Sequence, residues 1–355
     1  MKGWMGKIRT LLLLSSLSLI LSGCGKENLT AFLPKGYGAD VSLGIIITSL
    51  VVMIFVFVVV MIIYTFVLVR YRQKKGQEDF VPKQTEGNKA LEVVWTVIPI
   101  LLLVIIAVPT IAATYDLADK SGQKDALNIS VTGNQYWWHF SYDDQEIQTS
   151  QDLYIPTGKK VYLNMISSDV LHSFWVPSIS GKMDTNPENE NTMYIEAYEE
   201  GVYWGKCAEL CGPSHSKMDF KVVAVSQEEF DQWVSDMQNV DPEATPEATS
   251  AQEGQKLFEQ NCLSCHAIGS SPVAVAPNLT NFGDRTKIAG VVDYSKENLV
   301  DWILYPEEIK PGNKMVNAPY FGEHKDMKEF EDEAEKIADY LLQLKPSEIT
   351  PDSAQ

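Results

Sequence analysis

Two long runs without any charged side chain constrain the fold of this 355-residue chain more than any other feature of its sequence. Residues 41–69 and 93–115 contain no Asp, Glu, Lys or Arg. At about 1.5 Å per residue, each run as a helix is long enough to cross a hydrocarbon core of roughly 30 Å. We therefore predict two transmembrane helices, the second of which can kink at Pro99 and Pro109, as packing in a membrane allows. The alternative is a buried helical hairpin of a soluble protein, for which the runs are unusually long.

The charges beside these runs predict their orientation. The segment between them contains the basic cluster Arg-Tyr-Arg-Gln-Lys-Lys, Arg70 to Lys75, and basic loops remain on the cytoplasmic side of a membrane. Residues 24–118 therefore form a transmembrane hairpin, and both long flanks, with the N-terminus and the C-terminal domains, lie outside the cytoplasm. Glu92 directly precedes the second run, where a carboxylate interacts favourably with a helix N-terminus.

The N-terminus has the pattern of an export signal. Three basic residues precede an apolar run from Leu11 to Leu21, which closes in the sequence Leu-Ser-Gly-Cys at Cys24. A charged start, a short apolar stretch and small residues before a cleavage site are typical of such signals. The segment resembles a bacterial lipoprotein signal, which implies that residues 1–23 are removed and that Cys24 is lipidated. The alternative is an ordinary signal peptide that happens to contain a cysteine.

Short β-rich runs follow the second apolar run, separated by clusters of Gly, Pro, Asp and Asn. This spacing is typical of an all-β domain, which we place at residues 119–238. The sequence from Ser226 to Glu229 has the form of a capping box, which begins a helix, and we expect a closing helix through about Met237. The runs expected to form strands are residues 127–132, 135–142, 160–167, 192–198, 201–206 and 219–225.

One short stretch near the end of this domain gathers soft metal ligands. Cys207, Cys211, His215 and Met218 lie in the sequence C-A-E-L-C-G-P-S-H-S-K-M, and thiolates with imidazole and thioether favour copper over hard cations. A second imidazole, His172, lies in a strand-like apolar run that would end beside this loop in one β-domain. A mononuclear blue-copper site needs a single thiolate, so the second thiolate indicates a dinuclear centre. The alternatives are a disulfide between the two cysteines and a structural zinc site.

The spacing C-x-x-x-C-x-x-x-H-x-x-M resembles the CuA loop of cytochrome c oxidase subunit II, and nitrous oxide reductases have a similar centre. The resemblance covers roughly residues 30–238 and implies a cupredoxin-like Greek-key barrel for the all-β domain. The implied copper ligands are bridging thiolates from Cys207 and Cys211, imidazoles from His172 and His215, a weak thioether from Met218 and the backbone carbonyl of Glu209. The side chain of Glu209 is implied as a ligand for magnesium at the boundary with subunit I.

The same family has an aromatic patch through which electrons arrive. The corresponding segment here places Tyr136, Trp137 and Trp138 directly after Gln135. The usual order is Gln-Trp-Tyr-Trp, so a tyrosine takes the place of the tryptophan that is thought to receive the electron. These three aromatic residues are the candidates for electron arrival, and packing in a core or an interface is the alternative for aromatic residues in a strand.

Two further positions are assigned by the same comparison. His139 follows the aromatic candidates, and we do not expect it to be a metal ligand. The family also has an acidic residue at the position of Glu92. The resemblance implies that Glu92 marks the entrance to a proton path shared with subunit I.

A second chemical site follows a linker. Residues 239–250 are poor in bulky apolar side chains and contain two prolines, which is typical of an extended linker. Beyond it, the sequence Cys-Leu-Ser-Cys-His is the attachment signature of a c-type haem. In this signature Cys262 and Cys265 form thioethers to the haem, and His266 binds the iron. A zinc ribbon would need a second cysteine pair, and a thioredoxin-like site would need a different surrounding fold.

The residues around this motif resemble a small, all-α class I cytochrome c domain, which we place at residues 251–345, followed by a tail at residues 346–355. Apolar positions at helical spacing from Phe330 to Leu344 predict a last helix. We expect this helix to pack across the first helix of the domain, as the resemblance also implies.

The distal ligand of the haem must come from downstream of the attachment signature. The resemblance to small cytochromes favours Met315. Met327 and His324 are alternatives, although their charged stretch is typical of a solvated helix start. On the proximal side, the backbone carbonyl of Pro277 could accept the ring N–H of His266 and so orient the ring.

The charge of the chain argues against nucleic acid as a partner, since the formal net charge is -18. Residues 251–355 carry 10 Lys and Arg against 18 Asp and Glu, whereas soluble cytochromes that dock on acidic copper domains are typically basic. A tether supplies an effective concentration that is commonly about millimolar for short flexible linkers. We therefore expect the linker to bring the two domains together without strong docking contacts.

These features describe a multi-domain membrane protein that resembles subunit II of a bacterial caa-type cytochrome c oxidase with a fused cytochrome c. The resemblance implies electron flow from a cytochrome or a quinol-cytochrome c reductase to haem c, then to the dinuclear copper, and then to subunit I. The resemblance also implies that oxygen is reduced to water in subunit I, with protons pumped across the cell membrane. Oxygen chemistry is not expected in this chain itself, because neither apolar run contains a histidine that could hold the haems and copper that it needs. The alternatives are the CuA subunit of a nitric oxide reductase and a membrane-tethered copper carrier, for which a covalent haem has no purpose.

Overall fold

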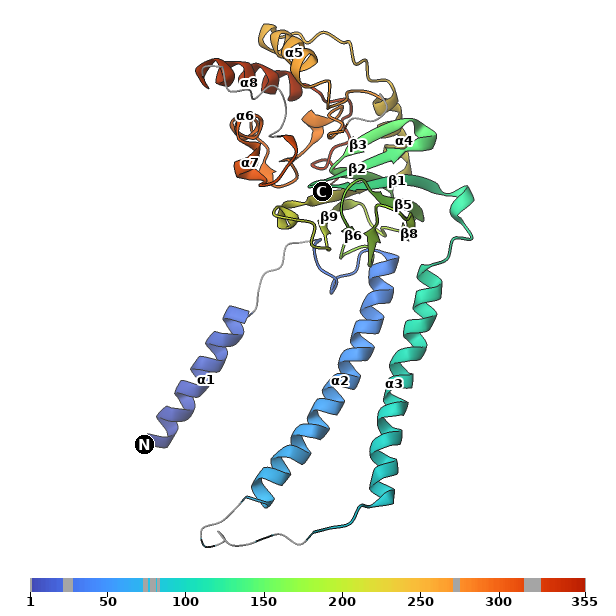
Figure 1. The fold of residues 1–355 in the computed structure, drawn as a ribbon, viewed down its shortest axis with the longest axis vertical. Coiled ribbons are helices and arrows are strands. Elements are labelled where there is room, and N and C mark those ends of the chain that lie inside the picture. The colour runs from blue at the N-terminus through green and yellow to red at the C-terminus, as the bar shows by residue number, and fades with distance from the viewer. Residues whose placement is uncertain are drawn as a thin grey trace.

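The computed structural model describes residues 2–21, 28–72, 76, 81, 84–270, 275–315 and 327–354, and it describes the backbone alone for residues 2–7, 18–21 and 327–329. From the N-terminus the chain forms one separate helix, a pair of long helices, a β-domain and a helical C-terminal domain, as Figure 1 shows. The strands of the β-domain lie between Leu127 and Val225, and the first helix of the C-terminal domain begins at Thr249, inside the predicted linker. Cys24 and His324 lie outside the described residues.

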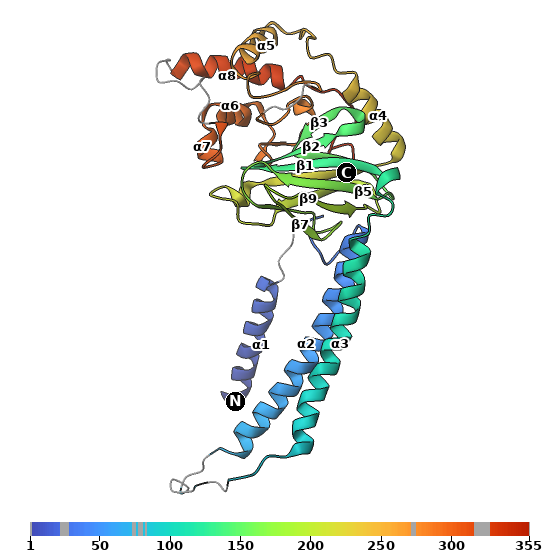
Figure 2. The same cartoon turned by 45° about the vertical axis from the view of Figure 1, so that its right-hand side comes forward.

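The two predicted transmembrane helices are confirmed. Helix α2 spans Tyr37–Arg70 and helix α3 spans Lys89–Leu117, and the two lie side by side in both views (Figures 1 and 2). Both are long and apolar enough to cross a membrane, and none of their most apolar residues is buried in the protein. The alternative of a buried soluble hairpin is therefore wrong. Pro99 and Pro109 both lie inside α3, and helix α1, Lys2–Leu21, covers most of the predicted export signal.

Helix α3 begins with a side-chain cap. The side chain of Asn88 accepts hydrogen bonds from the backbone N–H groups of Ala90 and Leu91, at 3.0 and 3.3 Å. Glu92 lies in the first turn, where its carboxylate interacts favourably with the positive end of the helix dipole. This position agrees with the structural role predicted for Glu92, whereas its part in a proton path remains a prediction.

Backbone and side-chain contacts join the helix pair to the β-domain. Gly36, just before α2, forms a β-bridge with Ala197. A Cβ at Gly36 would lie 2.3 Å from the carbonyl oxygen of Glu196, so glycine alone permits this approach. The hydroxyl of Tyr37 donates to Asp116 at 2.6 Å and so ties the start of α2 to the end of α3.

The predicted all-β domain is confirmed as two five-stranded sheets that enclose an apolar core. The strand order is β3-β2-β1-β5-β8 in one sheet and β4-β10-β9-β6-β7 in the other. The pairs β1–β5 and β4–β10 are parallel, and the other neighbours are antiparallel. The strands are β1 Leu127–Asn134, β2 Trp137–Tyr142, β3 Ile147–Ser150, β4 Asp152–Pro156, β5 Val161–Ser167, β6 His172–Trp175, β7 Lys182–Thr185, β8 Asn191–Ile195, β9 Gly201–Cys207 and β10 Asp219–Val225.

Three of these strands, β3, β4 and β7, were not predicted from the sequence. Strands β3 and β4, the edge strands of the two sheets, carry Ser150 and Asp152, which are polar and yet buried, because the C-terminal domain covers these two edges. The prediction for residues 135–142 also began too early. Asn134 pairs with Trp137, so the two residues between them form the turn of the β1–β2 hairpin.

Helix α4, Gln227–Gln238, closes the core of the β-domain. The predicted capping box is confirmed, because the side chains of Ser226 and Glu229 each accept a hydrogen bond from the backbone N–H of the other residue. From this helix the fully buried Trp233 stacks on Tyr154, with ring centroids 4.5 Å apart.

The C-terminal domain is helical, and its last helix packs across its first, as predicted. Gly254 lies at this crossing, where an added Cβ would be 1.9 Å from the carbonyl oxygen of Lys336. The elements are α5 Thr249–Asn261, β11 Lys287–Ile288, β12 Val292–Asp293, α6 Lys296–Leu304, α7 Pro306–Ile309 and α8 Met327–Leu341.

We expect Gly254→Ala to destabilise the C-terminal domain by about 1–3 kcal/mol, the usual cost of overpacking. Alanine gains about 1 kcal/mol over glycine in helix propensity, but the carbonyl of Lys336 belongs to a backbone that cannot yield easily. Denaturant unfolding followed by haem absorbance measures the change. Lys256→Ala is the control on the same helix, because Lys256 is exposed on α5, and an equal effect of both substitutions would contradict the close crossing.

The C-terminal domain packs directly on the β-domain. The backbone N–H of Asn278 donates to the hydroxyl of Ser150 at 3.0 Å, and Ser347 donates to Asp236 at 2.6 Å. A Cβ at Gly290 would lie 2.6 Å from the carbonyl oxygen of Asp219. The expectation that the linker acts without strong docking contacts is therefore wrong, because residues that look solvated in the sequence pair across the two domains.

Candidate metal centre and haem site

Strand pairing brings the candidate copper ligands together. His172 is the first residue of β6, and Cys207 is the last residue of β9. These strands are antiparallel neighbours, with Phe174 opposite Cys207. The chain then turns through a loop that carries Cys211 and a short 3-10 helix that begins at His215, before it enters β10. The imidazole and the first thiol are thus set by the sheet, and the remaining groups by the loop.

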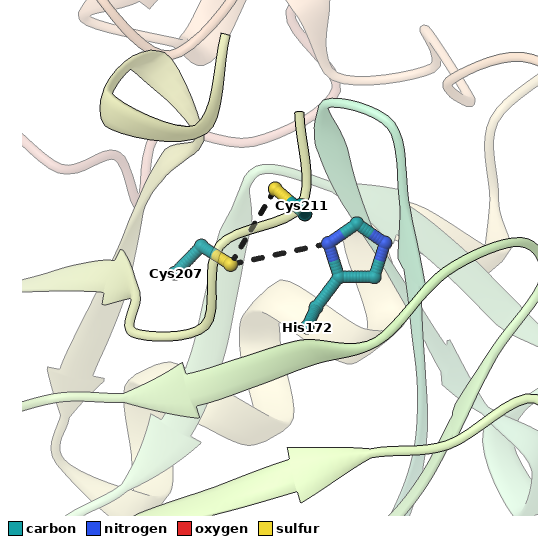
Figure 3. Close-up of side chains that lie close together, drawn as sticks. All are labelled: His172, Cys207 and Cys211. Atoms are coloured by element: carbon teal, nitrogen blue, oxygen red, sulfur yellow. Dashed lines mark hydrogen bonds between the residues drawn. The ribbon is translucent and has the colours of Figure 1, made fainter. Parts of the chain in front are cut away.

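The ligand atoms of three of these residues converge in one buried place. Figure 3 shows His172, Cys207 and Cys211, whose ligand atoms lie within 4.8 Å of one another. Nδ1 of His172 is 3.9 Å from Sγ of Cys207, and Nδ1 of His215 is 3.6 Å from Sγ of Cys211. Sδ of Met218 is 3.9 Å from Sγ of Cys211. Each thiol therefore has its own imidazole, which suits a pair of metal ions better than one.

Two further observations add a ligand to the cluster and exclude a disulfide within it. The backbone oxygen of Glu209 is 3.2 Å from Sγ of Cys207, so this carbonyl is directed into the site, while the Glu209 carboxylate accepts from the N–H of Leu210. The two Sγ atoms of Cys207 and Cys211 are 3.9 Å apart and both thiols are free, far from the about 2.05 Å of a disulfide. The alternative of a disulfide is therefore wrong.

The two thiols influence each other's ionisation. The hydrogen-bond contact with Cys211 lowers the pKa of Cys207, against the effect of burial, and His172 lowers it further. The same contact raises the pKa of Cys211. One thiolate therefore forms readily, and the second proton leaves when a cation binds. Two thiols, two imidazoles, a thioether and a carbonyl fit copper, and they exceed the four ligands of a structural zinc site.

Two residues that sequence reasoning missed hold these ligands in place. Oδ1 of Asp169 is 2.8 Å from Nε2 of His172, which leaves Nδ1 of the ring facing the thiol of Cys207. The N–H of Gln135 donates to Asp169 at 2.9 Å, and its side chain donates to the carbonyl of Cys211 at 2.6 Å. Burial would raise the pKa of Asp169, but hydrogen bonds led by the one from His172 lower it. A carboxylate three residues before a ligating histidine is the signal that could have identified Asp169.

The three aromatic candidates for electron arrival lie in different surroundings. Trp138 is fully buried, with its ring centroid 6.0 Å from that of His172. Tyr136 is 3% exposed and borders the copper loop, since a Cβ at Gly212 would lie 2.5 Å from its hydroxyl. Trp137 is half-buried and packs edge-on against His139 at 5.9 Å. Trp138 is thus a core residue that also contacts a candidate ligand.

The candidate haem attachment site lies at the end of α5. Cys262 caps this helix, and its carbonyl accepts the N–H groups of Cys265 and His266 at 3.0 and 2.9 Å. Both thiols are free. Nδ1 of His266 is 2.8 Å from the carbonyl oxygen of Pro277, which confirms the predicted support and leaves Nε2 for iron. Two free thiols one turn apart beside an oriented imidazole fit a covalently bound haem c.

The position of the distal ligand is less constrained. Met315 is half-buried, and its N–H donates to the side chain of Asn313 at 2.9 Å. Met327 begins α8, but its side chain lies outside the described part of the chain. Met315 therefore remains the predicted ligand.

Comparison with known families covers all three parts of the chain. Residues 44–113 match the transmembrane domain of cytochrome c oxidase subunit II, and residues 143–225 match its periplasmic domain. Residues 251–345 match the family of cytochrome c. The family of the periplasmic domain implies copper, and the family of cytochrome c implies haem c.

Curated relatives of the chain are second subunits of oxidases. A cytochrome c oxidase subunit 2 of Bacillus subtilis is 48% identical over 87% of this chain and 91% of its own length. That of Alkalihalophilus pseudofirmus is 47% identical over 94% of this chain and 96% of its own. A quinol oxidase subunit 2 of Bacillus cereus is 32% identical, and it covers 66% of this chain and 81% of its own length.

Proposed function

The chain belongs to the cytochrome c oxidase subunit II family and carries a cytochrome c domain at its C-terminus, and on this premise we propose that electrons enter a terminal oxidase through it. Electrons pass from haem c to the dinuclear copper and on to subunit I. Subunit I reduces oxygen to water and pumps protons. The protein itself is the second subunit of an oxidoreductase complex.

The observation that carries this proposal is the pairing of each thiol with its own imidazole. Cys207 lies beside His172, and Cys211 lies beside His215 and Met218. Copper bound here supplies one-electron redox chemistry. The protein supplies a buried set of ligands, and Cys207 and Cys211 would hold the copper between them.

The C-terminal domain supplies the second redox group of the chain. Cys262 and Cys265 would hold haem c covalently, and His266, oriented by Pro277, would bind its iron. Met315 would supply the second iron ligand. Of the aromatic residues, Tyr136 lies at the contact between the domains and is the candidate for passing the electron, with Trp137 and Trp138 beside it.

The remaining partners follow from the family. Subunit I contacts the helix pair, where Glu92 marks the start of a proton path, and the carboxylate of Glu209 holds a magnesium ion at the subunit boundary. An upstream cytochrome or a quinol-cytochrome c reductase donates electrons to haem c. The basic cluster near Arg70 lies in the cytoplasm, so both soluble domains lie on the outer side of a bacterial cell membrane.

We expect the mature chain to begin at a lipidated Cys24. Mass spectrometry of the intact protein checks this expectation, and a chain that still begins at Met1 would contradict it. Cys24→Ala should leave the protein in the membrane, because two spanning helices hold it more firmly than acyl chains do.

Purification of the whole complex tests the proposed function. We expect it to consume oxygen with a reduced c-type cytochrome as donor and to show no turnover of nitric oxide at a comparable rate. Consumption of nitric oxide in place of oxygen would assign the chain to a nitric oxide reductase. Ready release of copper to an apo-protein, without any turnover, would assign it to copper transport.

A further inference from the structure

A short segment of the C-terminal domain lies directly on the β-domain. This docking segment comprises residues 309–314 and leads into Met315. Lys217 of the β-domain donates to the carbonyl of Ile309 at 2.5 Å, and Ser214 donates to the carbonyl of Pro311 at 2.8 Å. In the opposite direction, Lys310 donates to the carbonyl of Tyr136 at 2.8 Å. Each domain therefore donates side-chain hydrogen bonds to backbone carbonyls of the other domain along this contact.

Lys310 differs from the other lysines of this contact by its burial. Only 3% of Lys310 is exposed, and in the described part of the chain the carbonyl of Tyr136 is the one hydrogen-bond partner of its ammonium group. Burial lowers the pKa of Lys310 to about 7, against the charge of Asp219. A lysine is costly to bury without an ion partner, so this contact forms only when the two domains are tightly apposed.

The backbone near Lys310 also allows the docking segment to lie close to Tyr136. Gly312 has φ +78°, and an added Cβ there would lie 3.2 Å from the hydroxyl of Tyr136. Glycine adopts this conformation without steric cost. The segment thus contacts both the carbonyl and the hydroxyl of Tyr136, the residue at the turn of the β1–β2 hairpin.

A second polar contact prevents rotation about the first. Asn278 and Ser150 are both buried and form a hydrogen bond across the interface. Nearby, the buried Lys221 contacts Thr286 of the C-terminal domain as well as Asp152 of its own domain. Buried contacts at separate places restrict the relative orientation of the two domains more than a single contact would.

Both contacts also adjoin the candidate redox sites. Asn278 follows Pro277, whose carbonyl orients His266. At the other end, Lys314 pairs with Asp169 at 3.0 Å, and Asp169 in turn orients His172. The residues that orient His266 and His172 therefore both lie beside the interface between the domains.

We infer that Lys310 is a positioning residue that locks the C-terminal domain on the hairpin turn at Tyr136, so that the domain acts as a permanently docked electron donor and does not swing on its linker. This inference rests on the proposed transfer from haem c to copper. Lys310 touches neither group, and it acts through the position of the docking segment.

Three variants of the full complex test this role. Lys310→Glu places an anion where the carbonyl of Tyr136 needs a donor, and Lys310→Arg keeps a donor. Lys256→Glu is the matched control, because Lys256 is an exposed lysine on α5 of the same domain. Unchanged visible and electron paramagnetic resonance spectra show that the haem and copper sites remain intact in each variant.

Hydrogen exchange of residues 309–314 reports docking independently of electron transfer. We expect exchange in Lys310→Glu to be at least about tenfold faster, since a buried acceptor loses its donor and the segment opens locally. We expect Lys310→Arg and Lys256→Glu to resemble the unmodified protein. Unchanged exchange in Lys310→Glu would overturn the role of Lys310.

Photoreduction of haem c then measures transfer to copper. In the unmodified complex we expect a rate that does not depend on solvent viscosity, and in Lys310→Glu a rate roughly tenfold lower, in proportion to the docked fraction. A viscosity-dependent rate in the unmodified complex, or faster exchange in Lys310→Glu with an unchanged rate, would overturn permanent docking as the basis of transfer. Absence of any transfer in the unmodified complex would refute the proposed function, and the exchange result would still decide whether Lys310 locks the domains.

Discussion

Replacement of Cys207 or Cys211 by serine is expected to remove the dinuclear copper from the chain. Each thiol contacts a different imidazole, so the loss of either one separates a ligand pair and removes one of the two proposed bridging thiolates. A hydroxyl is a hard ligand that does not replace a thiolate at copper. Metal analysis of the purified complex should fall from about two coppers per chain to about one or none, with loss of the mixed-valence paramagnetic signal.

Met218→Leu is the matched comparison for the cysteine variants. Met218 is fully buried, so leucine preserves the apolar volume and removes only the thioether. A weak axial ligand affects the reduction potential of a copper centre more than its ability to hold copper. We therefore expect this variant to retain copper with a shifted reduction potential. Equal copper loss in Met218→Leu and in both cysteine variants would contradict the assigned ligand roles.

Conversion of Cys262 and Cys265 together to serine is expected to abolish use of the native donor. Without either thioether the chain cannot hold haem covalently. The native donor must then reach the copper site directly, although the docked C-terminal domain covers it. We expect oxidation of the donor to fall by at least about 100-fold, the scale on which a tethered reaction partner outperforms a free one. A haem stain after denaturing electrophoresis and an assay of donor oxidation measure the two effects.

The control for this double variant lies inside the same motif. Ser264→Ala changes an exposed residue between the two cysteines and should leave both haem and turnover unchanged. Copper content should be unchanged in the double variant, because the copper ligands all belong to the β-domain. Full donor oxidation without covalent haem would show that electrons reach copper by another route.

The parts of the fold that depend on local composition could be predicted from the sequence. The two uncharged runs form α2 and α3. A helix that crosses a membrane must be long and apolar, and both properties can be read from the sequence. The capping box at Ser226 is equally local. The copper cysteines and His215 lie within one loop, so their spacing alone indicated a shared site.

The parts that depend on contacts between distant segments could not be predicted. Strands β3 and β4 look too polar for a core because the C-terminal domain that buries Ser150 and Asp152 lies far along the chain. Lys310 resembles a solvated lysine in a charged sequence, and only the folded interface shows that it is buried. The support of His172 by Asp169 was missed for a different reason, because the carboxylate is nearby but its direction is set by the turn.

Time-resolved photoreduction of haem c in the intact complex follows electron transfer within this chain. We expect haem c to be reoxidised with the same time course with which the dinuclear copper is reduced, at a rate that does not depend on protein concentration. Reduction of copper while haem c stays reduced, or a rate proportional to protein concentration, would contradict transfer within this chain.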